Sequence, residues 1–200
     1  MLLSNKEEYS IISSKNDVTL YKSKIDNTNY RISFNINVPE SLKHKVIPNK
    51  YVNIKLYETL ESMNKDVIEK IDIIVNNDEI DTYLVLFRFN HLGKELGMKK
   101  KYMLSKVKFV NTDNYNCCGI VSTSAKLDSI ELTDYDEIIC ENSNLLSFIH
   151  EGGIGVHYDF KLDLMQELPN YMKDFGALLM KKIFIKMREY ILHDIQNTDL

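Results

Sequence analysis

Hydrophobic and polar residues alternate most regularly near the end of the chain. After the pair Gly152-Gly153, hydrophobic side chains occupy every second position, at Ile154, Val156, Tyr158, Phe160 and Leu162. The period then changes, because from Asn170 to about Asp194 hydrophobic residues recur every three or four positions. A period of two predicts a strand and a period near 3.6 predicts a helix. We therefore expect a strand that leads into a long terminal helix.

The terminal helix carries more apolar surface than one neighbouring strand can cover. Its main stripe consists of Met172, Phe175, Leu179, Ile183, Met187 and Tyr190. Exposing such a face to water costs roughly 25 cal/mol per Å² of apolar area, so this stripe must be buried. A closed core and a cavity for an apolar ligand both satisfy that requirement, and periodicity does not distinguish them.

Shorter patterns along the rest of the chain predict an α+β fold. The expected strands span residues 18–25, 30–38, 67–75, 80–90, 100–110, 115–124 and 135–148. The expected helices span residues 4–13, 39–46 and 50–63, the first with Ser4 and Glu7 as a capping box. Short polar turns between consecutive strands favour antiparallel pairing. We expect one domain, residues 1–200, in which a curved antiparallel sheet wraps around the terminal helix and two short helices follow the first strands.

Composition and charge argue against several classes of protein. The chain is 44% hydrophobic and 27% charged, with a formal net charge of -4, and it shows no basic face for nucleic acid. Three cysteines, Cys117, Cys118 and Cys140, suit a reducing compartment and lie near no histidine at metal-ligand spacing. No stretch of 18 uncharged apolar residues predicts a membrane span. We expect a cytoplasmic protein without metal or cofactor.

Candidate catalytic groups are few. His157 lies in the terminal strand, but alternation directs it away from Val156 and Tyr158, on the same outer face as Asp159 and Asp163. A general base must lie within reach of a bound substrate. Because no ionisable group is expected inside the fold, we do not expect an enzyme.

Several segments resemble the START (StAR-related lipid transfer) domain. They are residues 17–21, which are similar to the first strand of the family, 67–72, 121–124, 141–148, the glycine pair 152–153, residues 156–163 and Leu168-Pro169 before the last helix. These segments occur in the same order and at similar spacing as in the family, and the match covers residues 7–194. The chain contains no tryptophan, so the Trp-Asp pair usual near the middle helices of the family is absent and Tyr57-Glu58 stands nearby. The chain thus resembles a divergent member of the family.

This resemblance implies a helix-grip fold of the wider Bet v 1-like superfamily, with one lipid held non-covalently in an apolar tunnel under the terminal helix. The lipid would be a phospholipid, a sterol or a related molecule, and delivery would involve transient contact with a membrane surface. The residues expected to bind the ligand are Tyr83, Val85, Phe87, Ile154, Val156, Tyr158, Phe160, Phe175, Leu179, Ile183 and Met187. The residues expected to contact the membrane are Leu92, Leu96, Met98, Lys99 and Lys100.

Two other functions remain open from the sequence. The first is a non-catalytic module that binds another protein, in which the cavity would be closed. A cyclase or hydratase of the same superfamily would instead need ionisable groups in the cavity. Cavity volume separates the first alternative from lipid binding, because sites for small molecules usually measure roughly 300–1,000 Å³.

Overall fold

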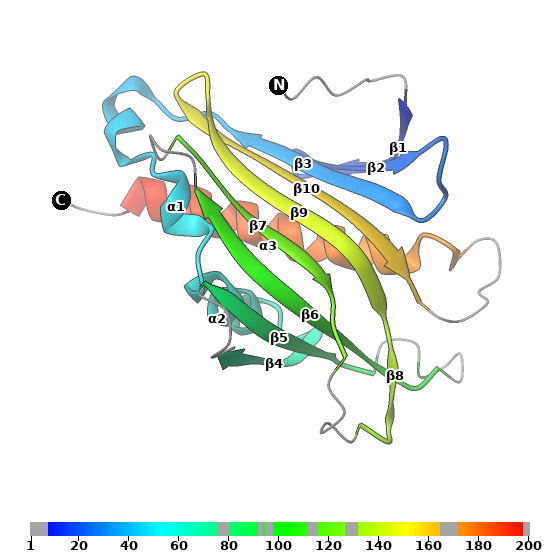
Figure 1. Ribbon diagram of the computed structural model, residues 1–200. Helices are drawn as coiled ribbons and strands as arrows, with labels where there is room; N and C mark the ends of the chain where they lie inside the picture. The colour runs from blue at the N-terminus through cyan, green and yellow to red at the C-terminus, as the bar shows by residue number, and fades with distance from the viewer. Residues whose placement is uncertain are drawn as a thin grey trace.

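A single curved sheet and one long helix dominate the structure (Figure 1). The structure is a computed structural model that describes residues 8–75, 81–91, 94, 98–111, 116–126, 132–164 and 172–197. Within these residues, the helix α3 (Phe175–Asn197) lies along one face of the sheet. This arrangement confirms the expected helix-grip fold.

The strands from residue 18 onward follow the expected order, except that residues 135–148 form two strands instead of one. The first strands are β1 (Tyr9–Lys15), β2 (Val18–Ser23) and β3 (Asn29–Ile36), and those after the middle helices are β4 (Ile68–Val75), β5 (Thr82–Phe89), β6 (Lys100–Asn111), β7 (Cys117–Ser124), β8 (Tyr135–Glu137), β9 (Ile139–His150) and β10 (Gly153–Asp163). In space the order is β1-β2-β3-β10-β9-β7-β6-β5-β4. All of these neighbours are antiparallel, and the short strand β8 pairs with β6 in parallel.

Strand β10 lies in the interior of the sheet, between β3 and β9, and confirms the alternation seen in the sequence. Ile154, Val156 and Phe160 are at most 3% exposed and face α3, on what we call the inner face of the sheet. Gly153 allows β10 to approach β3, since a Cβ atom there would lie 2.0 Å from the carbonyl oxygen of Ile36. A side chain at this position would therefore separate the two strands.

The middle of the chain forms three short helical segments rather than two helices. A 3₁₀ helix spans Glu40–Lys45, and α1 (Pro48–Tyr51) and α2 (Lys55–Met63) replace the single helix expected over residues 50–63. Asn53 lies in the break, where its side-chain amide donates to the carbonyl of Asn49 (2.8 Å) and its side-chain oxygen accepts from the backbone N–H of Lys55 (2.9 Å). These two hydrogen bonds occupy the carbonyl of Asn49 and the backbone N–H of Lys55. The Asn53 side chain thus takes the place of helical backbone bonds, and α1 ends at Tyr51.

The first expected helix is wrong in the part that the structure describes. Residues 9–15 form the edge strand β1, which pairs with β2, whereas Ser4 and Glu7 of the expected capping box lie outside the described residues. β1 has a single neighbour and no fully buried side chain, so its sequence lacks the alternation that marks a buried strand. Backbone hydrogen bonds to β2, rather than a hydrophobic pattern, hold residues 9–15 in a strand conformation.

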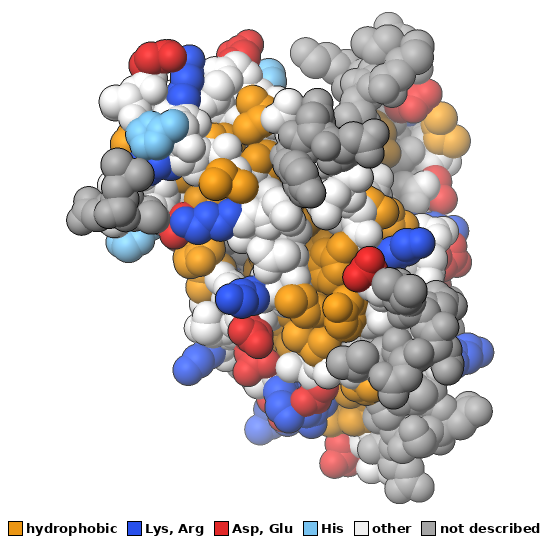
Figure 2. Space-filling model, turned by 60° about the vertical axis from the view of Figure 1, so that its left-hand side comes forward, with side chains coloured by type: hydrophobic (Ala, Val, Ile, Leu, Met, Phe, Trp, Pro, Cys, Tyr) orange, Lys and Arg blue, Asp and Glu red, His pale blue; other side chains and the backbone are white. Residues whose placement is uncertain are grey.

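Ion pairs at the rim join α3 to the ends of the sheet. Arg188 of α3 bonds Asp17 in the β1–β2 turn at 2.7 Å, while Lys182 and Lys186 both contact Asp66 at 2.6 Å, just after α2. On the face drawn in Figure 2, hydrophobic side chains gather in a central area bordered by charged groups. Surface ion pairs of this kind contribute little to stability, so burial of apolar area holds α3 in place.

Candidate ligand cavity

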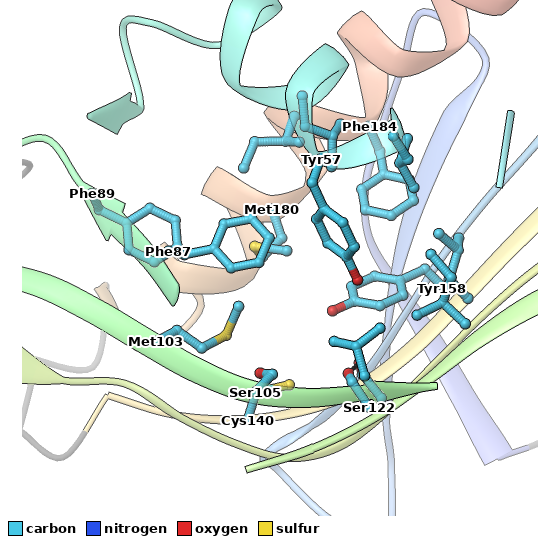
Figure 3. A pocket seen from close by; sticks show the side chains of 17 residues that line it. Tyr57, Phe87, Phe89, Met103, Ser105, Ser122, Cys140, Tyr158, Met180 and Phe184 are labelled. Carbon is cyan, nitrogen blue, oxygen red and sulfur yellow. Dashed lines mark hydrogen bonds between the residues drawn. The ribbon is translucent and has the colours of Figure 1, made fainter. Parts of the chain in front are cut away.

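Two small cavities lie between α3 and the inner face of the sheet. The first has a volume of about 60 Å³ and is enclosed by α2, α3 and strands β5, β6, β7, β9 and β10. Its walls are Leu56, Tyr57, Leu60, Phe87, Phe89, Met103, Ser105, Val107, Ile120, Ser122, Cys140, Ser143, Leu145, Tyr158, Met180, Ile183 and Phe184 (Figure 3). The lining is mostly apolar, as in sites for small hydrophobic molecules.

The second cavity adjoins the first. Its volume is about 40 Å³, and it lies near the start of α3, where Phe175, Gly176 and Leu179 form one wall. Phe89, Met103 and Met180 line both cavities. Two of these three shared side chains are methionines, whose flexible side chains adapt to irregular neighbours. Rotation of the Met103 and Met180 side chains would change how the empty space is divided between the two cavities.

Stacked aromatic rings form the rigid part of the first cavity. Tyr158 of β10 lies between Phe160 and Phe184, with ring centroids 4.8 and 4.9 Å away. Across the cavity, Tyr57 of α2 meets Phe87 edge to face at 5.8 Å. Aromatic pairs in these geometries add about 0.5–1.5 kcal/mol each to the gain from burial. The rings thus fix the two tyrosines on opposite walls.

A group of polar side chains interrupts the apolar lining of the first cavity. The hydroxyl groups of Ser122 and Ser143, on paired strands, are 2.5 Å apart, and the Tyr158 hydroxyl is within hydrogen-bonding reach of Ser143 and Cys140. Burial raises the pKa of Tyr158 far above its usual value and that of the Cys140 thiol to about 11. These groups are therefore neutral near pH 7, and the thiol is a poor nucleophile.

Tyr57 differs from the other polar groups of the cavity. Its side chain is 6% exposed, and burial raises the pKa of its hydroxyl well above the usual value. Figure 3 shows the hydroxyl pointing into the cavity, toward Tyr158. Among the described residues this hydroxyl has no hydrogen-bond partner. The hydroxyl oxygen is not among the fully buried polar atoms that lack a partner, so it borders the open space of the cavity, where a ligand atom could reach it.

The second cavity contains a charged side chain. Lys101, on the inner face of β6, is 6% exposed, and its ammonium group contacts a carboxylate oxygen of Asp136 at 3.3 Å. Asp136 lies on β8, which the parallel pairing with β6 holds beside Lys101. The lysine charge is therefore compensated by protein.

The residues predicted to bind ligand occupy three different environments. Phe87, Tyr158 and Ile183 line the first cavity, while Phe175 and Leu179 line the second. The remaining six lie outside both cavities: Tyr83, Val85, Ile154, Val156, Phe160 and Met187. Five of these six are buried in the core, and Tyr83 is half-buried against Phe109. Met187 lines a separate pocket of about 390 Å³ beside α2. Contact between the other five residues and a ligand would require a larger cavity.

The sequence interpretation missed the cavity walls that α2, β6, β7 and β9 contribute. Ser105, Ser122 and Ser143 face inward although they are polar, so the alternation assigned them to no buried face. Counting in steps of two from the buried neighbours Val107 and Leu145 would have identified their orientation.

The segment predicted to contact a membrane is described only in part. Leu92 and Leu96 lie outside the described residues. Met98 is 4% exposed and lines the second cavity, so its side chain is not at the surface in this conformation. Lys99 is exposed, and Lys100 bonds Glu69 at 2.8 Å.

The groups considered for catalysis lie away from the cavities. His157 is on the outer face, as predicted, with its ring 5.0 Å from that of Phe148, and Asp159 beside it binds Arg31. The described residues contain no cluster of three or more histidine, cysteine, aspartate or glutamate side chains arranged to hold a metal ion. Within the same residues, no helix combines the length and the apolar character needed to cross a membrane.

A curved sheet that grips a terminal helix over small apolar cavities defines a helix-grip protein. Solved structures of START-type domains share this fold. The lipid transfer and protein localization domain of human StarD13 superposes with a TM-score of 0.67 at 14% identity, over 90% of this chain and 87% of that one. Human STARD10 gives 0.66 at 10% identity, over 96% and 78%.

A bacterial protein has the same fold. The STAR-related lipid transfer protein of Xanthomonas axonopodis matches with a TM-score of 0.59 at 7% identity, over 92% of this chain and 98% of that one. No protein-family model and no curated protein matches the sequence. The resemblance to the START domain is thus confirmed at the level of the fold.

Proposed function

We propose that this protein binds one lipid non-covalently beneath α3 and transfers it between membranes. The observation that carries the proposal is the pair of adjoining apolar cavities between α3 and the inner face of the sheet. The names of the structurally similar proteins support it, because human StarD13 and the Xanthomonas protein are described as lipid transfer proteins. Each CH₂ group moved from water into such a site contributes about 0.8 kcal/mol.

The size of the cavities sets a condition on this function. Their combined volume is roughly 100 Å³, below the roughly 300–1,000 Å³ typical of ligand sites. A lipid therefore needs space that α3 and the shared methionines Met103 and Met180 must provide by moving. The ion pairs of α3 with Asp17 and Asp66 are at the surface and oppose such movement only weakly.

The proposed function includes brief contact with a membrane surface and a cytoplasmic location. The Lys99 side chain is 60% exposed and contacts Asp136 only at 3.7 Å, so at the surface outside the second cavity it can turn toward anionic head groups. Cys117, Cys118 and Cys140 are free thiols, as is usual in a reducing compartment. We infer that the lipid enters near this end of α3.

A variant that fills the first cavity tests the proposal. Ser105 lies on its wall and is 3% exposed, so Ser105→Leu places three additional carbon atoms into the space without exposing them. Native mass spectrometry of protein purified from cells, and transfer of labelled lipid between vesicles, should show bound lipid and transfer for the wild type. Both should fall at least about tenfold for Ser105→Leu, which corresponds to about 1.4 kcal/mol.

The matched control is Ser33→Leu, which introduces the same side chain on the outer face of β3. It should bind and transfer lipid as the wild type does. Absence of bound lipid and of transfer in the wild type would refute the proposal, as would equal activity of Ser105→Leu and Ser33→Leu.

A second function is favoured by one observation, the small volume of the cavities. A module that binds another protein needs no internal space, and a nearly filled interior suits it. The same experiment separates the two functions, since such a module would carry no lipid and Ser105→Leu would leave partner binding unchanged. An enzyme would need an ionisable group, and among the described residues none lines the first cavity apart from neutral tyrosine and cysteine.

A further inference from the structure

The lining of the first cavity restricts the chemical class of its ligand. Among the described residues that form it, none is aspartate, glutamate, lysine, arginine or histidine. A charged head group placed there would lose its hydration without gaining an opposite charge, which costs several kcal/mol per ion. The end of a ligand that occupies this cavity is therefore uncharged.

The second cavity offers no better position for an anion. Lys101 is its charged lining residue, and Asp136 already compensates that charge. A carboxylate or phosphate that approached Lys101 would compete with Asp136 and be repelled by it. Lys99 also contacts Asp136, at 3.7 Å, so two lysines share this carboxylate.

An entirely apolar ligand would leave Tyr57 unsatisfied. The side chain of Tyr57 is 6% exposed, and its hydroxyl points into the first cavity without a hydrogen bond to any described residue, so an apolar ligand that fills this space would leave the hydroxyl without a partner. The hydroxyl of Ser105 lines the same cavity from the opposite wall, on β6. Each hydroxyl can donate to, or accept from, a neutral oxygen.

From this lining we infer that the ligand is an apolar molecule bearing one uncharged oxygen group, an alcohol or a carbonyl, which hydrogen-bonds Tyr57 in the first cavity. The inference rests on the proposed function and specifies its ligand class. A neutral lipid with a free hydroxyl satisfies it, whereas a fatty acid anion or a phosphate-bearing head group in this cavity does not. The apolar body then extends toward the second cavity, past Phe89, Met103 and Met180.

Three small molecules of equal chain length test the inference. n-Hexanol, n-hexane and hexanoate are titrated into the wild type and Tyr57→Phe by calorimetry at about pH 8. Hexanol should bind the wild type, and Tyr57→Phe should weaken it by about three- to tenfold, the value of one neutral hydrogen bond. Hexane should bind both proteins alike, and hexanoate should bind the wild type at least about tenfold more weakly than hexanol.

The control variant is Tyr102→Phe, which removes a tyrosine hydroxyl from the outer face of β6, on the same strand as Ser105. It should bind hexanol as the wild type does. Urea unfolding of each variant verifies that it is folded at the temperature of the titration.

The outcomes distinguish this inference from the proposed function. Equal weakening of hexane and hexanol by Tyr57→Phe, or tightest binding by hexanoate, would overturn the ligand class and leave lipid binding intact. Failure of all three molecules to bind, with no lipid on the purified protein, would overturn both.

Discussion

Met103 forms part of the wall shared by the two cavities, and its replacement by alanine should join them. The Met103 side chain is 6% exposed and borders both spaces, of about 60 and about 40 Å³. Methionine-to-alanine substitutions in protein cores cost about 2–5 kcal/mol. Because Met103 faces empty space on two sides, it loses fewer contacts than a fully surrounded side chain. We therefore expect Met103→Ala to lower the free energy of unfolding by about 2–3 kcal/mol.

The enlarged cavity should also bind an apolar ligand more tightly. Urea unfolding, with and without n-hexane, measures both effects. At a ligand concentration of a hundred times Kd, binding adds about 2.7 kcal/mol, which would restore the stability that Met103→Ala loses. The smaller cavities of the wild type should give a smaller gain at the same concentration.

Met187→Ala is the matched control for this prediction. Met187 is also in the protein interior, 1% exposed, and borders neither of these two cavities; the separate pocket of about 390 Å³ that it does line is edged by charged side chains such as Lys55 and Glu58, so it does not suit hexane. Its replacement should cost as much or more, and hexane should not restore the loss. Equal behaviour of the two variants would show that the space around Met103 is not connected to a ligand site.

Two further predictions concern the sheet. Burial lowers the pKa of His157, so the folded protein binds a proton there less readily than the unfolded chain. The stability contribution is complete above the unfolded pKa of about 6.5 and is lost as the pH falls below it. His157→Asn should therefore reduce the difference in free energy of unfolding between about pH 7.5 and about pH 5.5, and an unchanged difference would contradict this. Gly153→Ala should cost about 3 kcal/mol or more, because its Cβ atom would meet the Ile36 carbonyl at 2.0 Å. Gly152→Ala, with φ at 79° in a turn, should cost only about 1–2 kcal/mol, and thermal unfolding compares the two.

Strands with one buried face were predictable from the sequence, and the edge strand β1 was not. In β10, burial of alternate side chains under α3 imposes a period of two that the sequence must keep. In β1, no side chain is fully buried and one neighbour supplies the backbone hydrogen bonds, so the hydrophobic pattern carries little information. The break between α1 and α2 was missed because it depends on the side-chain bonds of Asn53.

The cavity was predictable only where its walls are hydrophobic. Phe87, Tyr158 and Ile183 stand out because they continue regular apolar patterns. Inward-facing Ser105 breaks such a pattern and resembles a surface position until its buried neighbours are considered. The orientation of the Tyr57 hydroxyl depends on how α2 packs over the sheet, which no local pattern determines.

The position of α3 has a consequence for how the protein is made. α3 follows every strand of the sheet along the chain, yet it covers the inner face and binds the β1–β2 turn through Arg188. During synthesis the strands leave the ribosome before the element that shields them. Their apolar face is then open to unwanted association until α3 docks, and contacts between distant segments form slowly. A nascent chain truncated before Phe175 should therefore engage chaperones that the complete chain releases.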